Sequence, residues 1–168
     1  MTAEKTNFTL GKMFLGEHEY AVDNQRRVVI PSQWRGEDPE ENRFFLFPGR
    51  DQSLQLVPFE TFQTMIEKLR KVSFADARAA TALATIGSMA AECVCDKQGR
   101  ITMTKNLMEH AGIKGKALLL GALTTVQIWN PDNWANRKID SETGLDVLQA
   151  LQEKPDDISD ILNRTLGS

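Results

Sequence analysis

The segments Asp23–Ile30 (DNQRRVVI) and Asp96–Met103 (DKQGRITM) carry one short pattern twice in this chain of 168 residues. Each opens with an aspartate, has an arginine at its fifth position and continues into residues that favour a β-strand. Aspartate is common at the start of a turn, because its carboxylate accepts hydrogen bonds from nearby backbone N–H groups. A turn and a strand that occur twice indicate a duplicated structural unit.

Apolar segments recur in the same order around the two turns. The further correspondences are Phe45–Phe47 with Leu118–Leu120, Leu54–Val57 with Val126–Trp129, and Phe62 with Trp134. The expected organisation has five parts: a disordered N-terminal extension (1–12), a first repeat (13–64), linking helices (65–91), a second repeat (92–138) and an acidic C-terminal tail (139–168).

The predicted fold is α+β and rich in β-structure, with two pseudo-symmetric ββαββα repeats. A repeat of about fifty residues is near the size at which a separate hydrophobic core is marginal. We therefore expect the repeats to share one core and copies of the chain to associate. The predicted strands are 14–22, 27–30, 44–47, 54–57, 93–95, 100–103, 116–121 and 125–129. The predicted short helices are 31–35, with Trp34 facing inward, 104–111 and 131–134.

Two longer helices are predicted between the repeats. The first has apolar residues on one face at helical spacing: Phe59, Phe62, Met65, Ile66 and Leu69. The second begins at Ser73, which forms a capping box with Asp76, and is rich in alanine. We expect it to pack closely against the sheet or another helix through one stripe: Leu83, Ile86 and Met89. The tail is predicted to add helical turns near 145–152 and 158–166.

The net charge of −3 conceals an asymmetry. Residues 140–168 hold seven acidic and two basic residues, whereas the rest of the chain has a small excess of basic residues. This acidity disfavours unspecific binding of polyanions but leaves room for a local basic tip. The N-terminus lacks the apolar region of a signal peptide and the chain lacks a long apolar run, so we expect a cytoplasmic protein without a membrane span.

The two cysteines, Cys93 and Cys95, lie two positions apart on a predicted strand. Their side chains therefore face the same way and cannot form a comfortable disulfide. With only His18 and His110 as histidines, the chain predicts no metal site and no cofactor. We interpret both thiols as small core residues.

The two turns have a chemistry that favours nucleic-acid binding. Asp23 and Asp96 would stiffen them, and Gly99 suits a backbone position of positive φ. Arg27 and Arg100 would then leave the turns in a fixed direction. From there a guanidinium reaches a phosphate or the O6/N7 edge of guanine.

Arg26 and Lys97 add positive charge beside these arginines, so both are further candidates for DNA contact. In the competing interpretation, each aspartate and the arginine four residues later form a surface salt bridge across their own turn. Such a bridge would contribute under about 1 kcal/mol. The repetition of the turn at the same place in both repeats favours the first interpretation.

Together with these turns, four further segments carry a resemblance to a known family: Met13–Gly16, Gly87–Glu92, His110–Ile113 and Ile128–Trp134. Over residues 13–138 the chain resembles the MraZ family of bacterial regulators, whose repeats belong to the SpoVT-AbrB-like group. The resemblance implies the swapped-hairpin, or double-split barrel, fold of the AbrB, MazE and MraZ proteins.

The resemblance also implies a sequence-specific DNA-binding transcriptional regulator of the division and cell-wall gene cluster. Such a protein would bind short direct repeats upstream of its own operon, as a nucleoid-associated ring of eight or more subunits. Arg27 and Arg100 would contact double-stranded DNA, and Asp23 and Asp96 would stiffen the turns. The family usually has glycine where this chain has Arg26, so either the first turn changes shape or its strain is tolerated.

Two other functions compete with this hypothesis. The same fold could serve as an antitoxin-like protein-interaction module without a direct DNA role, in which the acidic tail holds a basic partner. An enzyme is disfavoured, because the chain shows no nucleophile–base motif, phosphate loop or metal-ligand cluster. We interpret His110, in its short predicted helix, as structural.

Overall fold

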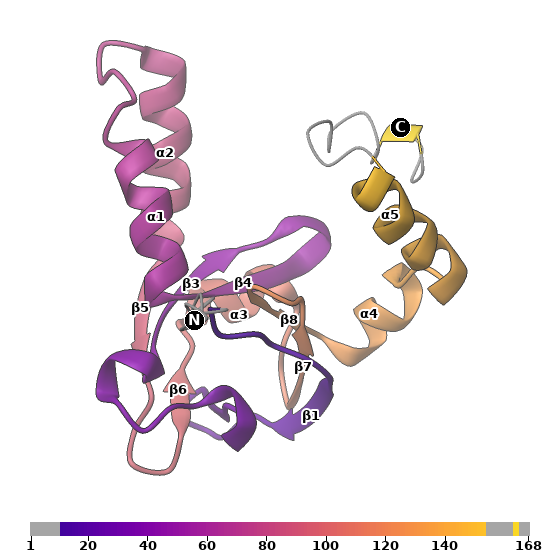
Figure 1. The fold of residues 1–168 in the computed structure, drawn as a ribbon. Coiled ribbons are helices and arrows are strands. Elements are labelled where there is room, and N and C mark those ends of the chain that lie inside the picture. The colour runs from indigo at the N-terminus through magenta and orange to yellow at the C-terminus, as the bar shows by residue number, and fades with distance from the viewer. Residues whose placement is uncertain (1–10, 154–162, 165–168) are drawn as a thin grey trace, which may run out of the picture. The chain divides into compact units, whose positions relative to one another are not determined.

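A six-stranded antiparallel sheet and a two-stranded ribbon contain the β-strands of the described residues, which are 11–153 and 163–164 of this computed structural model (Figure 1). The chain divides into two units, residues 1–133 and 134–168, and the strands all belong to the first. The large sheet has the order β1-β7-β8-β4-β3-β5. Its strands are β1 (Glu17–Ala21), β3 (Arg43–Pro48), β4 (Ser53–Pro58), β5 (Ala91–Val94), β7 (Lys116–Gly121) and β8 (Val126–Trp129).

The first strand of each repeat pairs with the other repeat. β1 lies against β7, β5 lies against β3, and β4 pairs with β8 at the centre of the sheet. The strand order is therefore symmetric, and neither repeat completes the sheet alone. The predicted α+β class with two repeats around one core is confirmed. Among the described residues, the strands form an open sheet and a ribbon rather than a closed barrel.

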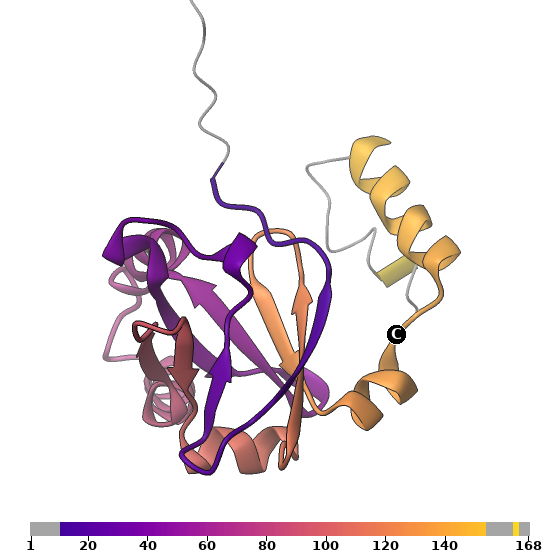
Figure 2. The same cartoon turned by 90° about the horizontal axis from the view of Figure 1, so that it is seen from below.

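The ribbon consists of β2 (Arg27–Val29) and β6 (Arg100–Thr102), the strands that follow the two turns (Figure 2). Val28 lies opposite Ile101, and both side chains are buried in the shared core. Because side chains alternate between the faces of a strand, the neighbouring positions lie on the outer face. These outer residues are Arg27, Val29, Arg100 and Thr102.

Each ribbon strand leads into a short helix that anchors it to the core. After β2 comes a 3-10 helix (Ser32–Trp34), and after β6 comes α3 (Lys105–Ala111). Trp34 and Leu107 are buried at equivalent places in these helices. The prediction of a short helix with Trp34 inward is confirmed. Two more 3-10 helices, Pro39–Asn42 and Arg50–Gln52, flank β3.

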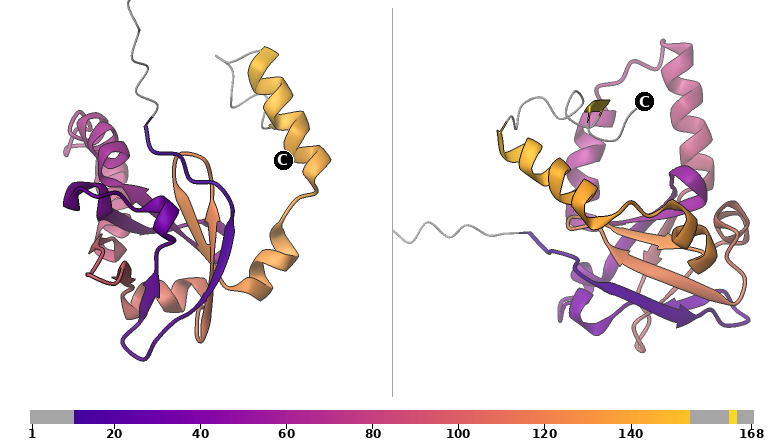
Figure 3. Two further views of the ribbon diagram at one scale, coloured as in Figure 1. Left: turned by 60° about the horizontal axis from the view of Figure 1, so that its bottom comes forward. Right: turned by 90° about the vertical axis from the view of Figure 1, so that its right-hand side faces the viewer.

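Helices α1 (Phe59–Leu69) and α2 (Ala77–Met89) project from the large sheet, away from the turn between β5 and β6 (Figure 1). The right panel of Figure 3 shows them as separate rods that are joined at their tip. No residue of either helix is buried. Of the predicted stripe on α2, Met89 packs against the core. For Leu83 and Ile86 the expected close packing is wrong within one chain, since they keep 40% and 44% of their surface exposed.

Two predicted element starts are also wrong. The second linking helix is capped by Asp76, whose carboxylate accepts hydrogen bonds from the N–H groups of Arg78 and Ala79, and not by Ser73. The first strand begins at Glu17 and not at residue 14, because Gly16 has a φ of 97° and interrupts the extended chain. Phe14 instead forms an isolated bridge to Leu123.

The second unit contains α5 (Ser141–Glu153), where helical turns were predicted near 145–152. Helix α4 (Pro131–Arg137) crosses the boundary between the units. Most of the expected N-terminal extension (residues 1–10) and most of the second tail helix predicted near 158–166 lie outside the described residues. Within the described part of the chain, no helix combines the length and the apolar character needed to cross a membrane.

Candidate nucleic-acid interface

The turn before β2 is organised by the carboxylate of Asp23. Its Oδ1 accepts hydrogen bonds from the backbone N–H groups of Gln25 (2.9 Å) and Arg27 (2.8 Å). Its Oδ2 accepts a hydrogen bond from Nε of Arg27 at 2.7 Å. One side chain thus fixes both the backbone of the turn and the direction of the arginine that follows it.

The turn before β6 has the same bonds in the same order. Oδ1 of Asp96 accepts from the N–H groups of Gln98 and Arg100, both at 2.9 Å, and Oδ2 accepts from Nε of Arg100 at 2.8 Å. Gly99 has a φ of 75° and Arg26, at the equivalent position, has a φ of 60°. The first turn therefore keeps the shape of the second and tolerates a non-glycine residue in the left-handed region.

The hydrogen bonds to the two carboxylates keep them ionised. The backbone N–H of Arg27 is the largest cause that lowers the pKa of Asp23, and the N–H of Arg100 does the same for the pKa of Asp96. The side-chain bonds from the two guanidinium groups lower both pKa values further. Each aspartate is thus a charged acceptor at neutral pH.

Arg27 and Arg100 lie on the outer face of the ribbon, as their alternation with Val28 and Ile101 requires. Their side chains are 29% and 26% exposed and are therefore neither free nor sealed. The Nε of each arginine donates a hydrogen bond to the aspartate of its own turn. In addition, Nη1 of Arg100 lies 4.0 Å from Oδ2 of Asp23. Each turn thus has the internal salt bridge that the competing interpretation expects. The Nη1–Nη2 edge of Arg27 has no hydrogen-bond partner among the described residues.

The other predicted site residues have distinct surroundings. Lys97 is exposed at the tip of the second turn. Arg26 is exposed as a residue, but its Nε donates a hydrogen bond to the backbone O of Met103. Gly99 is buried under Arg35, whose Nε donates to the backbone O of Ile30. Sequence analysis missed Arg35, because no local pattern links it to a turn more than sixty residues away.

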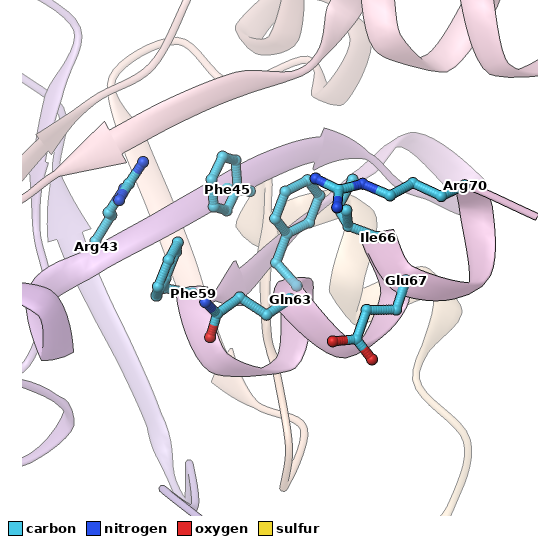
Figure 4. Close-up of a pocket in the computed structure, with 8 residues that line it drawn as sticks. Arg43, Phe45, Phe59, Gln63, Ile66, Glu67 and Arg70 are labelled. Atoms are coloured by element: carbon cyan, nitrogen blue, oxygen red, sulfur yellow. The ribbon is translucent and has the colours of Figure 1, made fainter.

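A second concave region lies between β3 and α1, where a groove of about 350 Å³ is lined by three phenylalanines and two arginines (Figure 4). The rings of Phe45 and Phe62 stack at 3.8 Å, and the guanidinium of Arg43 lies 4.5 Å from the ring centre of Phe59. Arg43 also forms a salt bridge of 2.6 Å to Glu92. We interpret this groove as packing between α1 and the sheet.

No group of three or more His, Cys, Asp or Glu side chains in the described residues is placed to hold a metal ion. His110 contributes instead to the fold, since its Nε2 lies 2.9 Å from the backbone O of Gly49. Cys93 is buried and Cys95 is partly buried. None of these described residues therefore forms a second candidate site beside the ribbon.

Comparison with known proteins assigns the chain to a family. The family model described as "MraZ protein, putative antitoxin-like" matches residues 13–85 and again residues 87–143. A protein named transcriptional regulator MraZ from Caldicellulosiruptor bescii is 33% identical over 142 residues, which cover 84% of this chain and 98% of the relative. Proteins of the same name from Pelotomaculum thermopropionicum and Thermoanaerobacter pseudethanolicus are 35% and 38% identical, over 75% and 73% of this chain and 86% and 84% of their own lengths. With both repeats matched and relatives similar over most of their length, the chain belongs to the MraZ family.

Proposed function

We propose that this protein is a DNA-binding transcriptional regulator that reads DNA with the outer face of its β2–β6 ribbon. The observation that carries the proposal is the pair of arginines on that face, Arg27 and Arg100, each held by an aspartate of its own turn. With Lys97, the proposed contacts are three cations beside two carboxylates. The surface is therefore locally basic on an acidic chain.

A two-stranded ribbon has a suitable shape for this role. The major groove of B-DNA admits a two-stranded β-ribbon, and its edges distinguish all four base pairs. An arginine that enters the groove can donate two hydrogen bonds to O6 and N7 of a guanine. Arg27 and Arg100 are diagonal neighbours on one face, so they could reach bases on successive steps of the same groove.

The ion pairs support this role more than they oppose it. A guanidinium has five N–H donors, and the aspartate takes the one on Nε. In Arg27 the end-on edge, with Nη1 and Nη2, remains for a bidentate contact. In Arg100 the Nη1 group also lies 4.0 Å from Oδ2 of Asp23. Because the side chain is already ordered, less conformational entropy is lost when DNA binds.

The exposed linking helices support self-association. Helix α2 is rich in alanine and carries one charged residue, Arg78. It nevertheless exposes the apolar side chains of Leu83 and Ile86. An apolar helix that is buried nowhere in its own chain is suited to pack against a second copy. We propose a closed ring of eight or more subunits, which would present identical ribbons in the same rotational sense.

Membership of the family also suggests which DNA the protein binds. A ring that presents its ribbons in one sense suits direct repeats of a short sequence, whereas a two-fold dimer would suit a palindrome. We propose such repeats upstream of the protein's own operon, within the division and cell-wall gene cluster, and a place for the protein in the cytoplasm at the nucleoid. A footprint on DNA from upstream of the gene tests this. Protected segments of equal spacing and orientation are expected, and protection that is equal on scrambled DNA would contradict the proposal.

A second candidate function is an antitoxin-like module, and α5 is the observation that favours it. This helix exposes Leu145 and Leu148 between acidic residues, in a segment that could hold a basic partner. Deletion of residues 140–168 separates the two functions. Specific DNA binding survives the deletion if the ribbon is the site, whereas the module hypothesis predicts loss of partner binding and no specific DNA binding by the full chain.

A further inference from the structure

One guanidinium covers the carbonyl at the end of each ribbon strand. In the first repeat Ile30 directly follows β2, and its backbone O accepts a hydrogen bond from Nε of Arg35 at 3.0 Å. In the second repeat the equivalent residue is Met103, and its backbone O accepts from Nε of Arg26 at 3.1 Å. The two bonds have the same chemistry and nearly the same length.

The two donors come from different places in the repeat. Arg26 belongs to the first turn, at the position that Gly99 occupies in the second. Arg35 follows the buried Trp34, so its equivalent in the second repeat is Met108, which follows the buried Leu107. Beside the glycine of the second turn, the arginine comes from the end of the 3-10 helix in the first repeat. Beside Met108 in α3 of the second repeat, the arginine comes from the first turn.

At the carbonyl of Ile30, space allows one arginine donor. A Cβ at Gly99 would lie 2.4 Å from Cζ of Arg35, so a side chain at this position would displace the guanidinium. On the other side of the ribbon, Arg26 and Met108 line one surface groove together with residues of α3 and the loop after it. An arginine at position 108 would therefore compete with Arg26 for the same carbonyl.

We propose that Arg26 is a positioning residue of the first turn, which replaces an arginine missing at position 108, and that it does not contact DNA. Its guanidinium ties the first turn to the residue after β6. At the other site Arg35 binds the residue after β2 and packs against Gly99 of the second turn. The two turns keep the same backbone shape through this exchange, so Arg27 and Arg100 are presented alike. The structural part stands without DNA, and only the statement about DNA contact rests on the proposed function.

A double-mutant cycle on the full chain tests this exchange, in which Arg26 supplies the hydrogen bond that an arginine at position 108 would otherwise supply. The variants are R26G, M108R and R26G/M108R, compared by their melting temperatures. In the R26G background, M108R restores a donor to the free carbonyl and is expected to raise the melting temperature by about 2–4 °C. In the wild-type background it brings a second guanidinium to an occupied carbonyl and is expected to lower it or leave it unchanged. An equal effect of M108R in both backgrounds would overturn the proposal.

The second repeat supplies the reciprocal control. G99R alone forces Arg35 from its place and adds backbone strain at a φ of 75°. The double variant G99R/R35M reproduces the combination of Arg26 in one turn with Met108 in the helix of the other repeat. It is expected to melt at a higher temperature than G99R, and a lower melting temperature would count against the exchange.

The role toward DNA is tested by the salt dependence of binding to DNA from upstream of the gene. A lost phosphate contact reduces the slope of log affinity against log salt by about one per engaged subunit. R26G is expected to keep the wild-type slope, and R26G/M108R is expected to keep it with an affinity within about twofold of wild type. A reduced slope for R26G would make Arg26 a DNA contact. If the wild-type protein binds no DNA, the proposed function fails, and the melting cycle still decides the exchange.

Discussion

Nη1 of Arg100 lies 4.0 Å from Oδ2 of Asp23, so the two turns of one chain are joined through a charge pair across the ribbon. Asp23 already receives Nε of Arg27 at 2.7 Å. One carboxylate therefore faces the arginines of both repeats, and the two proposed contacts to DNA form one electrostatic cluster. This arrangement lets the first turn influence the direction of Arg100 as well as that of Arg27.

Replacement of the aspartates by asparagine should weaken specific binding. In D23N/D96N the side chains can still accept backbone hydrogen bonds, but they no longer attract the guanidinium groups. The arginines should then sample more directions, and we expect roughly a tenfold loss of affinity for the specific site, about 1.4 kcal/mol. Fluorescence anisotropy with specific and scrambled duplexes measures it. Equal loss on both duplexes would show that the aspartates do not support base recognition.

The turns should resist acid more than ordinary surface carboxylates do. The pKa values of Asp23 and Asp96 lie below the ordinary value of 3.8, chiefly because backbone N–H groups bind the charged form. Their contribution to stability is therefore fully present above pH 3.8 and is lost as the pH falls through the lowered pKa values. An NMR titration of the side-chain carboxyl carbons, with D23N and D96N for assignment, checks this. Ordinary pKa values would contradict the hydrogen bonds.

Both cysteines should be unreactive in the folded protein. Burial raises the pKa of Cys93 to about 12 and that of Cys95 to about 11, so both remain thiols at pH 8. We expect iodoacetamide to modify them at least roughly tenfold more slowly in the native chain than in guanidinium-unfolded chain. Mass spectrometry over time measures the rates. Because the unfolded thiols ionise near pH 9, stability should also be lost as the pH rises from there toward the raised values.

An added charge on the apolar face of α2 should dissociate the assembly without unfolding the chain. Leu83 and Ile86 are already partly exposed, so L83E or I86E costs the isolated chain little. Light scattering after gel filtration should show smaller particles, and circular dichroism should be unchanged. The matched control is T81E, on the opposite side of the helix at 100° per residue. A wild-type monomer, or an equal effect of all three substitutions, would exclude this face as the interface.

The duplicated turn is the part of the fold that sequence predicts best, because its bonds lie within five consecutive residues. The exchange of β1 and β5 between the repeats was available only through the family resemblance, since periodicity identifies a strand and not its partner. The cap at Asp76 shows a similar limit, because Ser73 and Asp76 are both good capping residues three positions apart.

The exposed face of α2 could not be foreseen from its composition. An apolar stripe indicates burial, but it does not say whether the covering surface belongs to the same chain. Arg35 was missed for a related reason. Its partners, Ile30 and Gly99, meet only after the two repeats have paired across the ribbon.

The central claim is that Arg27 and Arg100 bind DNA while their own turns hold them. The most direct test measures anisotropy across a salt series, with DNA from upstream of the gene, for wild type, R27A, R100A and R27A/R100A. R70A/K71A removes the same charge from the tip region of the linking helices and is the matched control. We predict that each single variant loses at least roughly tenfold in affinity and that the double variant binds specific and scrambled DNA alike, with its assembly intact. Specific binding by R27A/R100A at the wild-type level would contradict the account.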